Sequence, residues 1–309
     1  MKKDGDVAFI RTLNDLKTAE ITSSVLGREV DRRAFLARCG RWTGGIILTA
    51  CFGSLASCGR RSDSTVERKK SERDYYLKQK DELIGQARGF SEELEQMMIP
   101  EYGQEEAGAI ASDMVEEYDK MIGELPYIGG DKNAHMTKLM IEASMSMAFC
   151  LAMKEHGKSI DDAGRLNYDT IEQNYQENPL PPDQRYKKGN VEQKRKEASE
   201  FAKWTQKREY PYNWVSIFVG DVPEPFIYGL DDIECGNLKL CKHYDIGSFT
   251  PYLCMLDNIL YPARGQGLTR TKTLADGFDR CDFRLSDDGV VELKEPFTTR
   301  KLREWGEIN

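Results

Sequence analysis

The chain has 309 residues, of which 39% are hydrophobic and 31% are charged, and its formal net charge is -8. This length is enough for one large domain or two modest ones. The first 58 residues carry nine Lys/Arg and six Asp/Glu, so the remainder has a net charge of -11. An acidic body of this kind argues against a general binder of the nucleic acid backbone, because phosphates would be repelled.

The N-terminal segment "DRRAFLARCGRWTGGIILTACFGSLASCGRR" has the features of an export signal. Arg32 and Arg33 form a pair that is followed by Phe-Leu and then by an uncharged, weakly apolar run over 43–58. This run is shorter than the roughly 20 residues that span a bilayer. The segment resembles a twin-arginine translocation signal, which implies the twin-arginine translocase as a partner during export. The alternative is a buried helix with a chance arginine pair.

The end of this leader, taken as 1–58, also resembles a lipoprotein box. "LASC" ends at Cys58 and "LTAC" ends at Cys51, and we prefer Cys58 because the polar "GRRSDSTVERKK" follows it directly. Lipidation there predicts a protein held at the outer face of the cytoplasmic membrane or in the periplasm, with 59–66 as a polar tether. Cleavage without a lipid is the alternative. Twin-arginine export moves folded proteins, as the resemblance implies, so we expect a fold that does not need disulfides.

The region 67–208 is predicted to be helical. Apolar side chains recur at helical intervals, and Gly/Pro-rich stretches separate the segments. The predicted helices cover 66–98, 105–122, 133–156, 160–176 and 192–207. Pro100 is expected to end the first of them. The third carries a run of methionines, which we assign to core packing rather than to a soft-metal or haem pocket.

The region 209–309 has a different character, and 67–309 is compatible with a single domain. "YNWVSIFVGD", "PFIYGLDDIEC", "GLTRTKTLADG" and "DRCDFRLSD" read as strands. "GNLKLCKHYD" and "FTPYLCMLDNILY" read as helices, the second with Thr250 as its cap and Pro251 in its first turn. The predicted fold class is α+β: a helical N-terminal layer packed on a small antiparallel sheet, with two inserted helices in the C-terminal third.

Five cysteines lie beyond Cys58, and no two of them form a C-x-x-C pair, so the usual zinc signal is absent. Cys235 is predicted to stand between a strand and a helix, where a helix N-terminus lowers the pKa of a thiol. Cys254 and Asp257 are three residues apart and share one helical face. Cys281 lies in the strand predicted to be the last, next to an aspartate. The alternative is that these thiols are small buried hydrophobic groups.

Several motifs of the last third, taken in order, resemble the L-2-amino-thiazoline-4-carboxylic acid hydrolase family. They are Cys235-Gly236, "PYLCMLD" (251–257), "GLTRTKTLADG" (267–277) and Cys281-x-Phe283, with "YNWVSIFV" before them. The helical region resembles the family only loosely. The resemblance implies a hydrolase that opens a cyclic isothiourea and leaves N-carbamoyl-L-cysteine.

This reaction needs a nucleophile, an acid and a cation for the substrate carboxylate. We assign Cys254 as the nucleophile and Asp257 as a proton carrier or orienting group. Cys235 and Cys281 are candidates for the same pocket. A variant mechanism has thiolates and Asp257 holding a metal ion that activates water. No cofactor is expected otherwise.

Four further residues are candidates for binding the substrate. Arg270 is placed to hold the substrate carboxylate through a bidentate pair. Thr271 and Thr273 alternate with the basic residues along the predicted strand, so they face the other side. If the pocket lies on the threonine side, Arg270 is only a surface charge. His243 is a candidate base, with a solvated helix histidine as the alternative.

Two other functions fit the same sequence. One is a non-catalytic lipoprotein that binds a small ligand and passes it to a membrane partner. The other is a redox or haem-associated protein that uses the cysteines. Convergence of Cys254, Asp257, Cys235 and Cys281 in one enclosed pocket favours catalysis, whereas scattered buried thiols favour binding.

Overall fold

The structure is a computed structural model that describes residue 72 and residues 74–308. The predicted leader and tether, with the arginine pair and both candidate lipidation cysteines, lie outside the described residues. The predicted two regions, by contrast, are described almost in full.

The N-terminal part of the described chain is a layer of helices. Its elements are η1 (Leu77–Gln79), α3 (Lys80–Tyr102), α4 (Gln104–Ile122), η2 (Gly130–Asn133), α5 (Ala134–Glu155), α6 (Ile160–Glu177) and α7 (Val191–Thr205). The predictions for α4 to α7 hold to within two residues. The prediction for α3 is wrong at both ends. The helix begins at Lys80, directly after η1, and it continues past Pro100 to end before Gly103. Gly103 has a φ of 81°, which a glycine adopts without strain.

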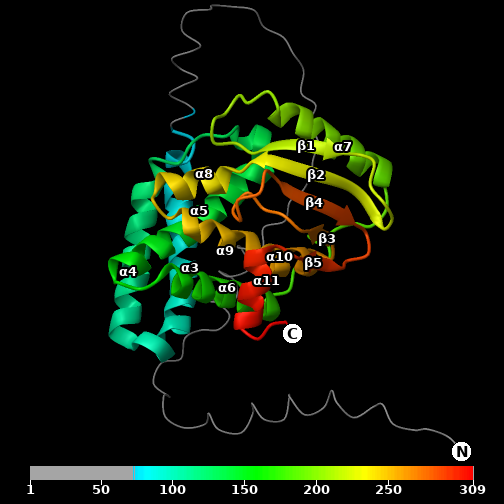
Figure 1. The fold of residues 1–309 in the computed structure, drawn as a ribbon. Coiled ribbons are helices and arrows are strands. Elements are labelled where there is room, and N and C mark those ends of the chain that lie inside the picture. The colour runs from blue at the N-terminus through cyan, green and yellow to red at the C-terminus, as the bar shows by residue number, and fades with distance from the viewer. Residues whose placement is uncertain (1–71, 73, 309) are drawn as a thin grey trace, which may run out of the picture. The chain divides into compact units, whose positions relative to one another are not determined.

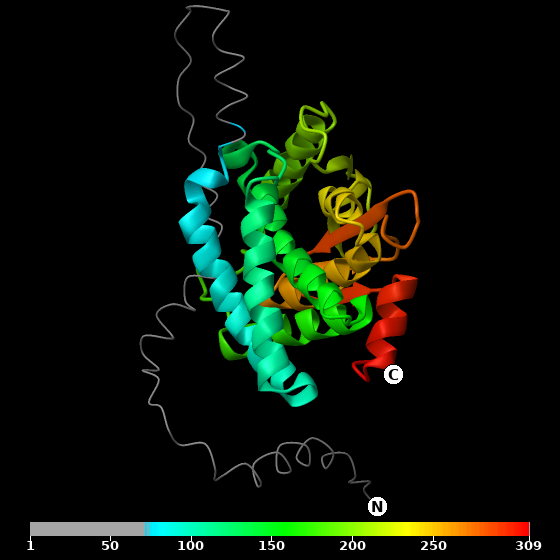
Figure 2. The same ribbon diagram turned by 90° about the vertical axis from the view of Figure 1, so that its left-hand side faces the viewer.

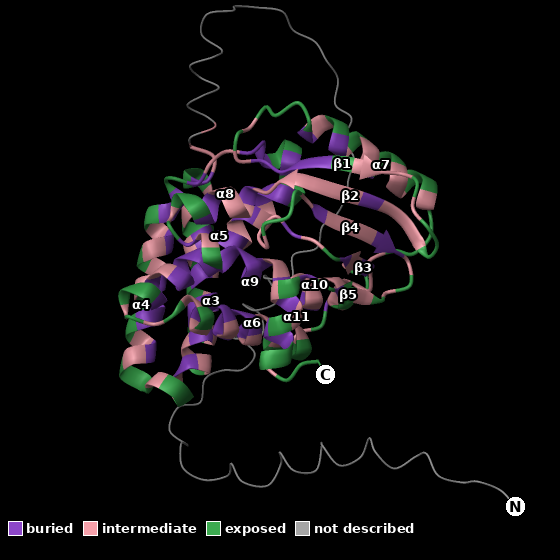
Figure 3. Cartoon of the chain, viewed as in Figure 1, coloured by how far each residue is buried: buried purple, intermediate pink, exposed green. Residues whose placement is uncertain are grey.

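Helix α5 forms the centre of the core. Met140, Met145, Met147 and Met153 are fully buried in it, which agrees with the prediction of a packing role. The stretch from Gly130 to Glu155 is long and apolar enough to cross a membrane, but 72% of its most apolar window is buried inside the protein. Figure 2 shows α3 and α4 covering it, and Figure 3 shows how much of it is buried.

The C-terminal part contains one five-stranded sheet. In spatial order its strands are β1 (Val215–Val219), β2 (Phe226–Glu234), β4 (Cys281–Ser286), β3 (Gly267–Arg270) and β5 (Val291–Leu293). All neighbours are antiparallel except β3 and β5, which are parallel. The α+β class is therefore confirmed, whereas the all-antiparallel sheet is corrected by this pair. Strand β5 and the final helix α11 (Pro296–Glu304) were not predicted, and Cys281 is not in the last strand.

Short helices connect β2 to β3. They are α8 (Gly236–His243), η3 (Gly247–Phe249), α9 (Thr250–Met255) and α10 (Asp257–Arg264). The second predicted helix is divided at Leu256, so Cys254 and Asp257 lie on opposite sides of a break. Thr250 does not cap α9, because Phe249 holds the cap position without a side-chain bond.

The connecting helices lie between the two layers (Figure 1). Helix α10 contacts α6 on one side and β3 and β5 on the other. Helix α9 approaches α6 so closely that a Cβ atom at Gly164 would overlap the ring of Tyr252. One buried cluster extends from Tyr76 to Leu302 and joins the N-terminal helices to the connecting helices and α11. The sheet has a second, smaller cluster, made by Leu268, Leu285 and Leu293. This packing fixes the position of the "YLCMLD" segment.

Candidate active site

One row of side chains crosses the sheet from β1 to β4. Ser216 on β1 is paired with Asp232 on β2, and Asp232 is paired with Cys281 on β4. Directly paired residues of antiparallel strands place their side chains on the same face, about 5 Å apart. The Ser216 hydroxyl donates a hydrogen bond to Asp232 Oδ1 at 2.5 Å. The row therefore places a carboxyl group beside a thiol.

Cys235 stands at the junction between β2 and α8, as predicted. It is the N-cap residue of α8, and its Sγ accepts a hydrogen bond from the backbone N–H of Leu238 at 3.4 Å. The backbone N–H of Asn237 and the Trp214 side chain also lower its pKa through hydrogen bonds. The free N–H groups of a helix N-terminus are natural donors to an anion.

Arg270, at the end of β3, is the centre of a buried charge network. Its Nε pairs with Glu295, its Nη1 donates to Asp257 Oδ2 at 2.5 Å, and its Nη2 donates to the Cys254 carbonyl at 2.9 Å. The guanidinium lies 4.9 Å from the centre of the Phe283 ring. Arg270 is 1% exposed and Glu295 is 0% exposed. The possibility that Arg270 is only a surface charge is therefore wrong.

The thiols connect the row on the sheet, which contains Asp232, with the charge network of Arg270. Cys254 interacts electrostatically with Arg270, Cys281 and Cys235. Asp232 in turn acts on both Cys235 and Cys281. The other two thiols and Asp257 thus all act electrostatically on Cys254. Neither of the two surface hollows given below encloses these four residues, so the criterion of one enclosed pocket stays untested.

Burial dominates the titration of the three thiols. It raises the pKa of Cys254 well above its usual value, that of Cys235 to about 11, and also that of Cys281. The expectation of a lowered pKa for Cys235 is wrong in sign, because loss of hydration outweighs the N–H donors. Burial also raises the pKa of Asp232 to about 7, against the effects of Ser216 and Arg270. Such a carboxyl group accepts and releases a proton near neutral pH.

The groups differ in how far solvent reaches them. Cys235, Cys254, Asp232 and Asp257 are partly accessible, although burial is the first cause of the raised pKa of the first three. Cys281 and Arg270 are buried behind them.

The two candidate threonines belong to a turn and not to a strand. Because β3 ends at Arg270, the predicted alternation of faces does not apply to them. Thr271 is exposed and donates a hydrogen bond to Asp282 at 2.6 Å. Thr273 is buried and bonds to Asp276 at 2.5 Å, and the next backbone N–H, of Leu274, donates to Cys281 Sγ at 3.2 Å. Both threonines shape the turn beside Cys281.

His243 is not brought to the cluster. It is the last residue of α8, at the opposite end from Cys235, and it is exposed. Its ring contacts those of Tyr212 and Tyr244. The solvated alternative describes it better than the role of a base.

The sequence analysis missed Asp232 and Glu295. Asp232 precedes Cys235 by three residues in "LDDIEC", but its meaning depends on the pairing of β2 with β4. Glu295 follows the unpredicted strand β5 and is the residue before α11. No three His, Cys, Asp or Glu side chains of the described chain are grouped so that they hold a metal ion.

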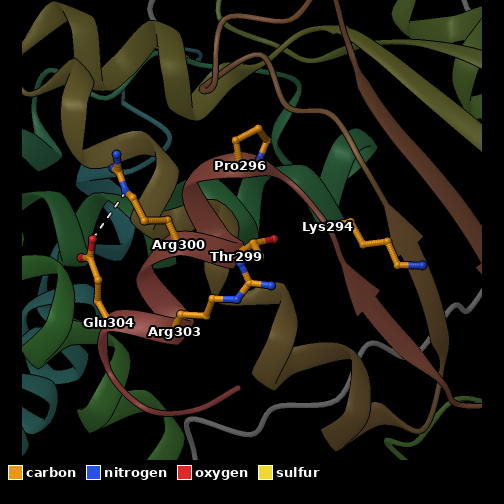
Figure 4. Close-up of a pocket in the computed structure, with 6 residues that line it drawn as sticks. All are labelled: Lys294, Pro296, Thr299, Arg300, Arg303 and Glu304. Atoms are coloured by element: carbon orange, nitrogen blue, oxygen red, sulfur yellow. Dashed lines mark ion pairs between the residues drawn. The ribbon is translucent and has the colours of Figure 1, made fainter. Parts of the chain in front are cut away.

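Two hollows at the surface of the described chain lie elsewhere. One, of about 440 Å³, lies along α11 and is lined by Lys294, Pro296, Thr299, Arg300, Arg303 and Glu304 (Figure 4). Another, of about 300 Å³, lies between α3 and α5. Neither is lined by a cysteine, so the thiol cluster is the better candidate for chemistry.

Comparison with known proteins adds one finding. Searches among curated proteins and among solved structures give no match. A family model, described as L-2-amino-thiazoline-4-carboxylic acid hydrolase, matches residues 131–285, which is half of the chain. The match runs from the start of η2 to the end of β4 and so contains all three thiols, Asp232, Asp257 and Arg270. On this match the chain belongs to the L-2-amino-thiazoline-4-carboxylic acid hydrolase family, a family named for hydrolysis.

Proposed function

We propose that the protein hydrolyses a small cyclic carbon–nitrogen–sulfur compound of the L-2-amino-thiazoline-4-carboxylate type and releases N-carbamoyl-L-cysteine. Membership of the family supports the reaction class. The convergence of thiols and carboxyl groups around Arg270 supports a catalytic centre rather than a passive binding site.

One observation carries the assignment of the nucleophile. Cys235 Sγ is the thiol that meets a helix N-terminus, with backbone N–H donors from Leu238 and Asn237. These donors stabilise the negative charge that develops on sulfur as it loses its proton. The sequence analysis assigned Cys254 as the nucleophile. Within the described chain, however, no backbone N–H donates a hydrogen bond to its sulfur, and the carboxylate of Asp257 accepts a hydrogen bond from Arg270. We therefore propose Cys235 for attack.

The first step is an exchange of sulfur atoms. Asp232 takes the proton of the Cys235 thiol, and Sγ bonds to the ring carbon that carries the amino group. The bond between this carbon and the ring sulfur then breaks. The proton held by Asp232 goes to the departing sulfur, which becomes a free thiol. The substrate is now open and attached to Cys235 through an isothiourea.

The second step is hydrolysis of this adduct. Asp232 takes a proton from water, whose oxygen adds to the same carbon. The bond from carbon to Cys235 breaks, and Asp232 returns its proton to Sγ. The proton left on the added oxygen moves to the former ring nitrogen, which gives the carbamoyl group. One water molecule is consumed in total, and N-carbamoyl-L-cysteine leaves.

The remaining groups position the reacting ones. Arg270 holds the Asp257 carboxylate and the Cys254 carbonyl, so it fixes both sides of the break at Leu256. Asp257 is thereby an orienting carboxylate, since Arg270 Nη1 holds its Oδ2 in place. Cys254 and Cys281 provide a polarisable wall for the ring sulfur.

The test is a turnover assay that follows thiol release from the thiazoline acid. We expect the purified protein to open the ring, and Cys235→Ser to lose about 10³-fold or more in kcat. Cys241→Ala is the matched control, because Cys241 lies on the same helix but is buried in the core. A Cys235→Ser variant with full turnover would remove this thiol from the mechanism.

We further propose that the protein is exported and lipid-anchored. The twin-arginine pattern at Arg32 and Arg33 and the lipoprotein-like box at Cys58 support this proposal. Mass spectrometry of the mature N-terminus is the measurement: a diacylated Cys58 is expected, and an unmodified N-terminal peptide would contradict the anchor.

A further inference from the structure

The proposed substrate carries a carboxylate, and Arg270 is not available to bind it. Three of the five N–H donors of a guanidinium are already used here, by Glu295, Asp257 and the Cys254 carbonyl. The side chain is 2% exposed. Moving it toward a ligand would leave Glu295 buried without its cation, which is costly. Another cation must therefore bind the carboxylate.

Most cations near the cluster already have an acidic partner. Arg280 and Arg284 both pair with Asp231, at 3.3 and 2.8 Å. Lys239 pairs with Glu234. Within the described part of the chain, the guanidinium of Arg264, the last residue of α10, forms no hydrogen bond and no ion pair. Lys272, next to the turn at Cys281, has no acidic partner among the described residues either, but its ammonium lies 6.0 Å from the centre of the Phe278 ring.

Arg264 lies on the same face of α10 as the site. Asp257, Tyr261 and Arg264 are separated by four and three residues, so they form one stripe along the helix. The stripe is about 10.5 Å long at 1.5 Å per residue. Side chains on a helix lean toward its N-terminus, which brings the Arg264 guanidinium back toward Tyr261.

The electrostatic environment agrees with this placement. After burial, the groups that act most on the pKa of Tyr261 are Asp257 and then Arg264, so both charged ends of the stripe influence its hydroxyl. Burial raises its pKa, and it remains a hydrogen-bond donor at neutral pH. On the other side, Arg264 acts on Glu142 of α5 and Tyr175 of α6. Glu142 itself forms an ion pair with Lys138 at 3.5 Å. It forms no ion pair with Arg264.

We infer that Arg264 binds the carboxylate of the substrate and sets the preference of the site for acids over uncharged rings. This inference rests on the proposed function. The reacting carbon lies at the thiol end of the stripe, Tyr261 lies along the ring, and the carboxylate lies at the Arg264 end. Arg264 is then a specificity-determining residue that touches the substrate but takes no part in proton transfer.

The experiment compares two ligands in the Cys235→Ser background, where ring opening is blocked. One ligand is L-2-amino-thiazoline-4-carboxylate and the other is 2-amino-thiazoline, the same ring without the carboxylate. Calorimetric titration is expected to show Arg264→Met weakening binding of the acid by about 10- to 100-fold, as for a charged hydrogen bond. Binding of the uncharged ring should change by less than about threefold. Arg264→Lys should recover part of the affinity for the acid.

Arg300→Met is the matched control, because Arg300 is 61% exposed on α11 and lines the hollow of Figure 4. Equal weakening of both ligands by Arg264→Met, or none for the acid, would overturn the inference. So would failure of the acid to bind the Cys235→Ser protein. If the acid binds through Arg264 but the wild-type protein does not release thiol, the proposed function fails and the inference stands.

Discussion

Two charged neighbourhoods lie side by side in this protein and differ in how completely their groups are partnered. Around Arg270, a buried guanidinium meets Glu295, Asp257 and a backbone carbonyl. Around Asp232, a carboxyl group has Ser216 as its hydrogen-bonding partner and two thiols nearby. In the first neighbourhood three contacts with acceptors hold the guanidinium in place, although Glu295 Oε2 is buried without a hydrogen-bond partner. The second keeps a group whose pKa of about 7 lets it exchange protons.

This difference in partnering distinguishes the residues that support the site from those that react. A buried ion network resists change, because removing one member leaves another charge unpaired. A carboxyl group that burial holds near neutrality is costly to the fold and useful for catalysis. Substitutions should therefore separate the two neighbourhoods by their effects on stability and on turnover.

The largest effect on stability is expected from Arg270→Met. It leaves Glu295 and Asp257 without their cation, so the free energy of unfolding should fall by about 3–5 kcal/mol. Urea denaturation measures this change. Arg284→Met is the matched control: its pair with Asp231 is partly exposed, and the loss should stay below about 1 kcal/mol. Similar losses in both variants would contradict a special role for the Arg270 network.

Asp232→Asn should act mainly on turnover. Removing the proton carrier is expected to lower kcat/KM about 10²-fold, or about 2.7 kcal/mol. In the wild-type protein kcat/KM should rise with pH through about 7, because Asp232 must be ionised to accept a proton. The variant should lack this rise. A pH–rate profile that is identical in both proteins would exclude Asp232 as the base.

The same variant should gain stability at high pH. The folded-state pKa of Asp232 is raised above the unfolded value, so its ionisation costs stability as the pH rises from about 4 to about 7. Asp232→Asn removes this cost and should be more stable by about 1–3 kcal/mol above pH 7. The difference should vanish near pH 4. Thermal unfolding at both pH values measures it, and a variant less stable at pH 8 would contradict the assignment.

The smallest effect is expected from His243→Gln. The side chain is exposed at the far end of α8 from Cys235, so turnover and stability should both stay close to those of the wild-type protein, within about 0.5 kcal/mol. Thiol release and urea denaturation provide the two measurements. A loss of turnover with stability unchanged would bring His243 back as a base.

The parts of the fold that sequence predicted well depend on local patterns. Helices α4 to α7 carry apolar side chains at helical spacing between clear breaks, and Cys235 follows a β-branched and aromatic run. Strand β5 has three residues, which are too few for any periodic signal, so the strand and its parallel pairing with β3 were missed. Helix α11 was also missed.

The parts of the site that sequence did not predict depend on distant partners. The burial of Arg270 results from Glu295, which reaches it from a later segment. The role of Asp232 on β2 results from its pairing with Cys281 on the neighbouring strand β4. The pKa of Cys235 was given the wrong direction because a helix N-terminus is visible in sequence, whereas burial is not.

The most direct test of the account is to trap the enzyme during turnover. The protein is mixed with the thiazoline acid, quenched with acid, digested and analysed by mass spectrometry. The account predicts an adduct on the Cys235 peptide with the mass of one intact substrate, because ring opening adds the whole molecule to sulfur. An adduct on Cys254 instead, or steady thiol release without any adduct in rapidly quenched samples, would contradict it.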